Sequence, residues 1–294
     1  MNEGIKKRLP TFGLLLVAMI WGAGFVFTQM AIDSGFSPGL ILVSRFTVAA
    51  LALMAVAGKR IFPLNRQEAV SGLIAGTFLF LGFYSQTAGL VITTPSNSGF
   101  FTVTNVIMVP FLAWAIHRRR PPIKLFGCSL MALGGFFILF WQAGQGFTVN
   151  SGDMLTLLCA FFYACHITSL GVLSAKVDFF RLTFLQLAFS ALFSLVCVLA
   201  FELPALVAAD IASGVKSILF LGLFSTCLCF LIQTAAQSRT SSGKAAVILS
   251  GEALWCMIFS VMAGYEAFTP RMVIGGVVIV GAICLLETDI LLGG

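Results

Sequence analysis

Few residues in this chain could do chemistry, and the most informative of them is Glu252. It lies well inside an apolar run, whereas the other ten Asp and Glu residues lie near the ends of such runs or between them. A carboxylate in apolar surroundings is costly, so its presence indicates either a ligand or coupling site, or a structural ion pair or hydrogen-bond network. Glu252 is therefore the first candidate site residue.

Three more residues inside apolar runs carry polar chemistry. Arg45 could clamp a carboxylate through two parallel hydrogen bonds, or it could be structural, reaching an interface or pairing with an acid. Tyr163 and His166 are three positions apart, which places them on one helical face. They could hydrogen-bond a substrate or relay a proton, or His166 could be a satisfied histidine between helices.

Two glutamines and four aromatic side chains extend the candidate substrate-binding set. Gln86 and Gln233 each offer two donors and an acceptor, to a substrate or to a neighbouring helix. The aromatic candidates, which stand at helical spacing within their runs or from a polar candidate, are Trp21, Phe25, Phe101 and Trp255. Aromatic walls beside a carboxylate would suit an apolar, amine-bearing ligand, although many of the 30 Phe residues must simply face lipid or other helices.

The chain lacks the parts of a catalytic or metal site. It has two histidines, His117 and His166, and one deep carboxylate, so no clustered acids and no nucleophile with its base are evident. The eight cysteines fall inside apolar runs without a C-x-x-C pair, so we expect no disulfide, no metal site and no cofactor. No phosphate-binding G-x-x-x-x-G-K-[ST] motif supports ATP hydrolysis.

The elements that position these residues are apolar helices. Of the 294 residues, 59% are hydrophobic and 10% are charged, whereas soluble domains carry about 25% charged residues. Continuous apolar runs of about 20 residues are long enough to cross a membrane and favour helices over the alternating strands of a barrel. We therefore expect an all-α integral membrane protein with ten transmembrane helices, at about 11–31, 38–57, 69–90, 96–116, 122–141, 152–173, 180–201, 212–234, 242–263 and 270–287.

The basic residues predict how these helices are oriented. If both termini are cytoplasmic, 14 of the 17 Lys and Arg residues fall in inner loops or at the N-terminus. The positive-inside rule thus favours a multi-pass protein of the cytoplasmic (inner) membrane with both termini inside. Because the charges are scattered over short loops, we expect no nucleic-acid partner. The run HRRRPP at 117–122 could contact lipid head groups or simply determine topology.

Two stretches of the chain resemble each other, QTAGLVITTPSNSGFFTVTN at 86–105 and QTAAQSRTSSGKAAVILSGE at 233–252. Aligned without gaps, Gln86 pairs with Gln233 and Asn105 with Glu252. Each stretch ends one apolar run, turns through a polar loop and enters the next run with small residues. We therefore predict two five-helix repeats, at 1–145 and 146–294.

Because five spans is an odd number, the two repeats must be inverted in the membrane. Inverted repeats are typical of secondary transporters, whose similar halves exchange conformations around a midplane site. Asn105 and Glu252 would then occupy related positions beside one central cavity. The repeat thus predicts a transporter that works by alternating access.

Several motifs resemble the EamA-type transporters of the drug/metabolite transporter superfamily. They are WGAGF at 21–25, SRF at 44–46, QTAGLVITTPSNSGFFTVTNVIMVPF at 86–111 and QTAAQSRTSSGKAAVILSGEALW at 233–255. The resemblance implies a ten-helix carrier of small organic metabolites, often amino acids or their analogues and commonly moved outward. Where the family usually has Glu-Pro in the ninth span, this chain has Glu252-Ala253, which puts a proline-dependent kink there in doubt, whereas Pro110 stands at the equivalent place in the first repeat.

The function expected is secondary-active or facilitative transport of an amino acid, an amine or an analogue, with export favoured. Protons are a candidate coupling partner through Glu252, Arg45 or His166, and a facilitator would need none. The alternatives are an integral-membrane enzyme acting on a lipid, a passive channel or a structural membrane protein. The substrate, and the choice between monomer and homodimer, stay open.

Overall fold

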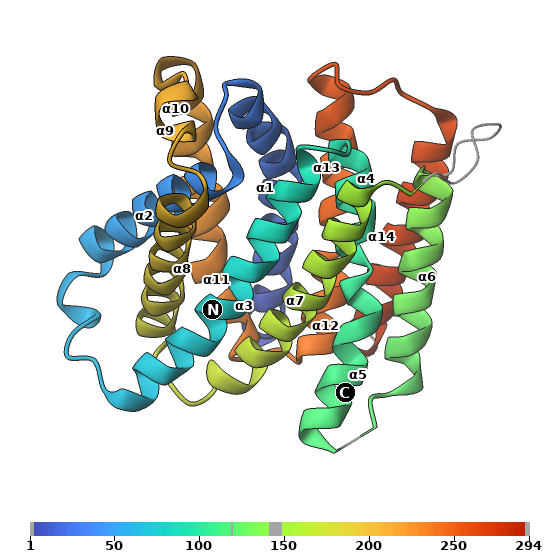
Figure 1. Ribbon diagram of the computed structural model, residues 1–294. Coiled ribbons are helices and arrows are strands. Elements are labelled where there is room, and N and C mark those ends of the chain that lie inside the picture. The colour runs from blue at the N-terminus through green and yellow to red at the C-terminus, as the bar shows by residue number, and fades with distance from the viewer. Residues whose placement is uncertain (1–2, 119, 141–148, 292–294) are drawn as a thin grey trace.

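The protein is a bundle of helices, as a computed structural model shows for residues 3–118, 120–140 and 149–291 (Figure 1). The helices are α1 (Glu3–Asp33), α2 (Pro38–Ala57), η1 (Gly58–Arg60), α3 (Arg66–Leu90), α4 (Pro95–Val103), α5 (Asn105–His117), α6 (Ile123–Phe140), α7 (Ser151–Leu173), α8 (Phe179–Phe201), α9 (Ala205–Ala208), α10 (Ile211–Phe220), η2 (Leu221–Leu228), α11 (Cys229–Gln237), α12 (Ser242–Leu249), α13 (Glu252–Met262) and α14 (Pro270–Leu291). Of these, η1 is a 3-10 helix and η2 is a π-helix.

The predicted membrane helices are confirmed within the described residues. Nine helical segments are long and apolar enough to cross a membrane, and a tenth apolar helix, α6, is shorter. At 1.5 Å per residue, the 18 residues of α6 still extend about 27 Å, close to the thickness of a hydrocarbon core. Some boundaries differ from the expected ones for local reasons: α3 begins at Arg66 because Asn65 and Glu68 form a reciprocal capping box.

Three of the ten spans are interrupted, and the sequence did not predict all three interruptions. The fourth span is split into α4 and α5 at Thr104, and the ninth into α12 and α13 at Ser250 and Gly251. The eighth passes through the π-helix η2 between α10 and α11. These interruptions matter because irregular backbone at membrane depth is tolerated where it is buried in protein or lines a cavity.

The helix contacts follow an inverted repeat. Helix α3 packs on α7 and α8, and its counterpart in the second half, the α10–η2–α11 span, packs on α1 and α2. Equivalent spans also meet each other: α2 packs on α8, α6 packs on α14, and the fourth span meets the ninth through α4 with α13 and α5 with α12. The half-helix α4 lies toward the upper end of the bundle and its counterpart α12 toward the lower end (Figure 1). The two halves therefore have inverted topologies.

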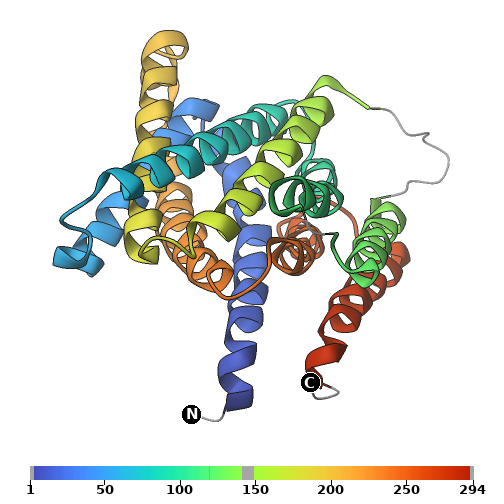
Figure 2. The same cartoon turned by 90° about the horizontal axis from the view of Figure 1, so that it is seen from below.

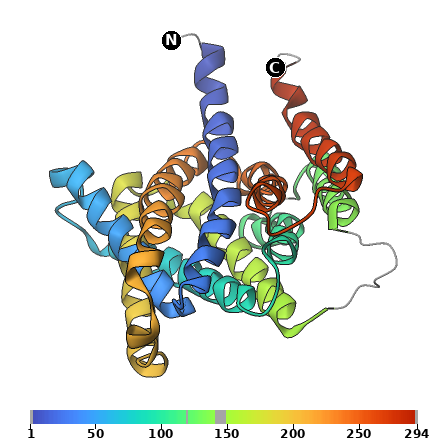
Figure 3. The ribbon, with the colours of Figure 1, turned by 90° about the horizontal axis from the view of Figure 1, so that it is seen from above.

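The connections between spans divide into two ends of the bundle. Those after α2, α5, α7 and α11 lie at the lower end in Figure 1, which we call the basic end, and those after α1, α3, α8 and α13 lie at the opposite end. The first turns of α1 and the last turns of α14 project in the same direction (Figures 2 and 3). The predicted repeat boundary between 145 and 146 lies outside the described residues.

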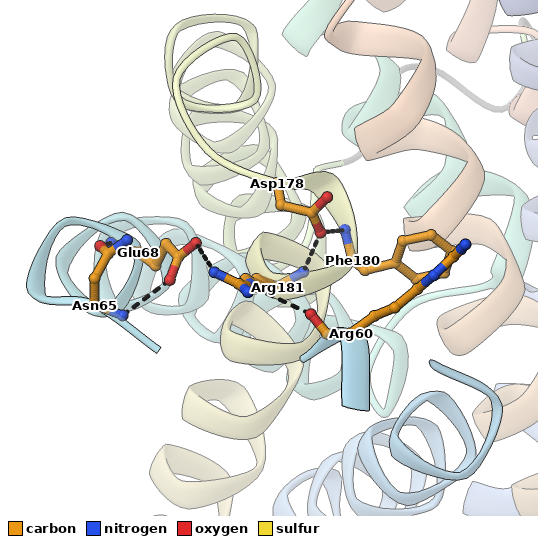
Figure 4. Close-up of polar contacts among 6 residues, drawn as sticks. All are labelled: Arg60, Asn65, Glu68, Asp178, Phe180 and Arg181. Atoms are coloured by element: carbon orange, nitrogen blue, oxygen red, sulfur yellow. Dashed lines mark hydrogen bonds and ion pairs between the residues drawn. The ribbon is translucent and has the colours of Figure 1, made fainter. Parts of the chain in front are cut away.

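At the basic end, polar contacts fasten the start of α8 to α3 and η1 (Figure 4). Arg181 Nη1 lies 2.8 Å from Glu68 Oε1, and Arg181 Nε donates to the carbonyl oxygen of Arg60 at 3.1 Å. Asp178 accepts hydrogen bonds from the first backbone N–H groups of α8, including that of Arg181. These contacts join the seventh span to the third span and to η1, which belong to the other half.

Glycines allow the closest helix approaches. A Cβ atom added to Gly72 would lie 2.2 Å from Leu185 Cβ, which is why α3 can press directly on α8. A Cβ on Gly135 would lie 2.9 Å from the carbonyl oxygen of Gly275, where α6 meets α14. Such close packing contributes to helix association in lipid, where there is no hydrophobic driving force between helices.

Adjacent glycines of α6 offer a matched test of this packing. We expect Gly135→Ala to destabilise the protein by about 1–3 kcal/mol, because its Cβ would meet the α14 backbone. Gly134→Ala should instead leave stability unchanged or raise it by up to about 1 kcal/mol, since a Cβ there meets nothing within 4 Å and Ala favours helix. Thermal unfolding in detergent measures both, and an equal effect of the two variants would contradict the packing described.

Candidate functional site

A cavity lies between the two halves, and the interrupted spans contribute to its wall. It contains about 670 Å³ of empty space, a figure that includes space open to solvent and so is an upper limit. Nine of the eleven residues predicted for the site line it: Trp21, Phe25, Arg45, Gln86, Asn105, Tyr163, His166, Gln233 and Glu252. This size and mixed lining are typical of small-molecule sites.

The interruptions of the fourth and ninth spans place the two residues paired in the repeat alignment. Asn105 is the first residue of α5, and Glu252 is the first residue of α13. At each junction the backbone tightens to i→i+3 hydrogen bonds, from Thr104 N to the carbonyl oxygen three residues earlier at 3.3 Å and likewise from Gly251 N at 3.2 Å. Both residues therefore stand at equivalent breaks near the middle of their spans.

The break in the ninth span does not need the proline whose absence left it in doubt. Ser250 Oγ donates to the carbonyl oxygen of Val247 at 2.7 Å, and Gly251 follows. In the fourth span, Thr104 Oγ1 makes the same bond to its own i−3 carbonyl at 2.7 Å, six residues before Pro110. Hydroxyls that bond back to the helix bend it, and glycine weakens it, so the doubt about a kink at Glu252-Ala253 is removed.

The side chains of Glu252 and Asn105 are unpaired among the residues that the structure describes. Their side chains are 7% and 6% exposed, and neither makes a side-chain hydrogen bond or ion pair with the residues that the structure describes. The ion-pair or network interpretation of Glu252 therefore finds no support in these ranges. An acid and an amide without partners are available to a ligand.

Arg45 is held by the π-helix instead of by an acid. Its Nε donates to Thr226 Oγ1 at 2.9 Å and its Nη2 to Ser225 Oγ at 3.2 Å. Its guanidinium lies 4.4 Å from the centroid of the Phe83 ring. Only 3% of the residue is exposed, so Arg45 does not reach an interface. No carboxylate among the described residues pairs with it, and its positive charge stays at the cavity wall.

The π-helix also fixes the aromatic wall. Trp21 Nε1 donates to the carbonyl oxygen of Ser225 at 2.8 Å, and the indole ring lies 5.3 Å from the ring of Phe230. A π-helix shifts its carbonyls out of the regular α-helical pattern and is frequent at functional sites. Arg45 and Trp21, from the second and first spans, are thereby positioned by one irregular stretch of the eighth.

Two polar networks surround the remaining candidates. Tyr163 Oη donates to Gln86 Oε1 at 3.2 Å, and Gln86 Nε2 donates to Thr102 Oγ1 at 2.9 Å. His166 Nε2 lies 2.8 Å from Gln186 Oε1, and Gln186 in turn bonds Thr234. His166 is thus a hydrogen-bonded residue between helices that also lines the cavity.

Some site residues were missed, and two predicted ones lie elsewhere. The missed lining residues include Thr28, Phe83, Thr87, Ser225 and Phe230. Three more missed residues, Thr102, Gln186 and Thr226, hold lining side chains by hydrogen bonds. The polar ones could have been noticed as hydrophilic positions within apolar runs. Phe101 does not line the cavity and packs against the adjoining apolar cluster. Trp255 does not line it either, because its ring stacks on Phe259 at 5.9 Å on the next turn.

The chain is similar to known transporters over nearly its whole length. The model of the EamA-like transporter family matches residues 9–141 and again residues 150–288. An uncharacterized transporter of Archaeoglobus fulgidus is 31% identical over 289 residues, which cover 97% of this chain and 88% of that relative. A solved crystal structure superimposes with a TM-score of 0.76 over 95% of this chain and 96% of that one, and at 17% identity it shows a shared fold only.

Replacing Trp21 and Trp255 in turn by Phe separates the role of the Trp21 hydrogen bond from that of an aromatic ring. We expect Trp21→Phe to lower the free energy of unfolding by about 1 kcal/mol, because the buried carbonyl of Ser225 loses its donor while the ring remains. Trp255→Phe is the control, since its indole makes no hydrogen bond with the described residues. Thermal unfolding compares them, and equal losses would argue against a role for the bond.

Proposed function

Because the chain belongs to the EamA-like transporter family, within the drug/metabolite transporter superfamily, we propose that it moves a small organic metabolite across the cytoplasmic membrane by alternating access. The family resemblance read from the sequence is confirmed, and the protein is a membrane-embedded transporter. Its substrate, in this proposal, is an amine, an amino acid or an analogue, and it binds in the central cavity.

One observation carries the proposal. The acid Glu252 and the amide Asn105 stand at the breaks of two equivalent spans, beside a cavity between the halves, without a partner in the described residues. Unpartnered polar groups at membrane depth are costly unless something else binds them. A transported ligand supplies that partner when the cavity is occupied.

The chemistry of the cavity favours a substrate with an amine. The carboxylate of Glu252 attracts a cation, and the faces of Trp21, Phe25 and Phe230 can stack on an apolar body or a cationic group. Arg45 adds a positive charge that suits a carboxylate. An α-amino acid carries both charges, whereas a simple amine would use only the acid.

Alternating access draws on the inverted halves. Each half contains a broken span, so rocking one half against the other can exchange the roles of α4–α5 and α12–α13 while the site stays between them. Glu252 is the candidate for proton exchange during this cycle, and a facilitator would carry substrate without it. Accumulation driven by a pH gradient supports coupling, and its absence supports facilitated transport.

The proposed orientation places the basic end in the cytoplasm. The basic residues at that end, named here where their side chains are described, are Lys59, Arg60, Arg66, Arg118, Arg120, Lys124, Lys176, Arg181, Arg239 and Lys244. The opposite end has few. The positive-inside rule then puts both termini inside, and export is the direction that we propose on the family resemblance.

The substrate proposal predicts ligand binding that needs the carboxylate of Glu252. Amines and amino acids from a broad panel should raise the unfolding temperature of the purified protein, because ligand binding stabilises the folded state. Glu252→Gln should weaken the best ligand about tenfold or more, equivalent to about 1.4 kcal/mol.

Asp210→Asn is the control for this test. It removes an exposed carboxylate at the start of α10, where Asn still caps the helix, and should leave affinity unchanged. Counterflow in liposomes tests transport of the same ligand. A folded protein that binds and moves no member of the panel would refute the proposal.

The orientation predicts which cysteines a membrane-impermeant maleimide reaches. Gln67→Cys, exposed at the basic end, should react only after cells are permeabilised, whereas Ala212→Cys, exposed at the opposite end, should react in intact cells. The parent chain is the control, because its eight cysteines all lie within helices. The reverse labelling pattern would place the termini outside.

A further inference from the structure

The two glutamines paired by the repeat, Gln86 and Gln233, differ in their hydrogen bonding. The amide of Gln86 donates to Thr102 and accepts from Tyr163, so both its ends are bonded. Gln233 lines the same cavity and is 0% exposed, yet neither its Nε2 nor its Oε1 has a hydrogen-bond partner. Within the described ranges it is the only side chain with two polar atoms that are both unpartnered and each less than 1 Å² exposed.

Water does not supply the missing partners of Gln233. Each of its two polar atoms exposes less than 1 Å² to solvent in this conformation. A buried donor and acceptor left without partners is a costly arrangement that proteins rarely keep without a use.

The repeat symmetry shows why no protein group fills the gap. In the alignment that pairs Gln86 with Gln233, the position of Thr102 is taken by Leu249, which has no polar atom. The first span of each half can be aligned as well, with Leu15-Leu16-Val17-Ala18 on Leu157-Leu158-Cys159-Ala160. Three positions after these stretches, Trp21 pairs with Tyr163. The indole N–H of Trp21 is already donated to the carbonyl oxygen of Ser225.

The same substitutions hold whichever way the transporter faces. If the halves exchange conformations, Gln233 would come to the place that Gln86 has now, where Leu249 could not accept from its Nε2. The Trp21 indole could donate to its Oε1 only by giving up the bond to Ser225. In that arrangement, too, the equivalent position supplies no acceptor for the amide nitrogen. A group brought into the cavity has to supply it.

We propose that Gln233 is a specificity-determining residue that recognises, on the substrate, a neutral group with a hydrogen-bond donor and acceptor side by side, such as a carboxamide. Two amides pair through two N–H···O=C bonds, which satisfies one donor and the acceptor of Gln233 at once. The inference rests on the proposed function and deepens it: Glu252 and Arg45 bind the charged groups, and Gln233 selects the remainder of the molecule. A site built to bond a polar group discriminates strongly against analogues that lack it.

The test uses glutamine and two analogues of similar size as probes. L-glutamine offers a donor and an acceptor, glutamic acid γ-methyl ester offers acceptors only, and L-methionine offers neither. In the wild-type protein, affinities from thermal shift or calorimetry should fall in that order, with glutamine bound at least about tenfold more tightly than methionine. In Gln233→Met, a near-isosteric change, the difference between glutamine and methionine should shrink below about threefold.

A matched control lies one turn further along α11. Gln237 is also buried, but its Nε2 donates to the carbonyl oxygen of Ile167 at 2.8 Å and it does not line the cavity. Gln237→Met should lower the unfolding temperature of the ligand-free protein and keep the order of the probes. Gln233→Met should not lower that temperature, because no hydrogen bond is lost.

Each outcome decides the inference. A Gln233→Met protein that keeps the wild-type order, or that loses as much stability without ligand as Gln237→Met does, overturns it. A wild-type protein that binds amines of the panel without preferring glutamine to methionine also overturns it, and leaves the proposed function standing. A folded protein that binds no amine or amino acid at all removes the function itself, and the inference with it.

Discussion

The structure depends on one constraint, which is that polar groups inside an apolar bundle must find partners within the protein. Water cannot reach them and lipid cannot bond them, so each unmade hydrogen bond costs free energy. The hydroxyls of Thr168 and Ser194 meet this constraint on their own helices, by donating to carbonyl oxygens four residues earlier. An amide has more donors and acceptors to satisfy, so its side chain bonds other helices. Gln86 thereby joins helices of both halves, and Gln186 joins three helices of the second half. Polar satisfaction thus decides how the helices are joined around the cavity.

The interrupted spans follow from the same constraint. A helix that breaks at membrane depth frees backbone groups, and here serine, threonine and indole side chains take them up. The fourth and ninth spans break where a hydroxyl bonds back to its own helix, and this turns Asn105 and Glu252 toward the cavity. The eighth span becomes a π-helix, whose carbonyl and hydroxyl groups hold Trp21 and Arg45. The binding cavity is therefore built from departures from regular helix, on a frame of regular ones.

The two halves share their backbone plan but not their polar partners. The contacts of α3 with α7 and α8 return in those of the eighth span with α1 and α2. Within that common frame, the first half closes its glutamine into a network, whereas the second half presents an acid and an amide that the described residues leave unpaired. Equivalent geometry with unequal chemistry suits a carrier, because both halves can move alike while each presents different groups to the cavity.

The sequence by itself determined the ten helices, the inverted pairing of the halves and the depth of Glu252. These follow from features local to the chain, since the length of an apolar run and the charges at its ends need no knowledge of neighbours. Only the tertiary structure decided that Arg45 rests on two hydroxyls, that Gln86 is bonded while Gln233 is not, and that Phe101 and Trp255 turn away from the cavity. Those outcomes depend on the rotation and depth of each helix. Close contacts at glycines, between segments far apart in the sequence, determine that rotation and depth. The periodicity of one helix does not show which face of another helix it will contact.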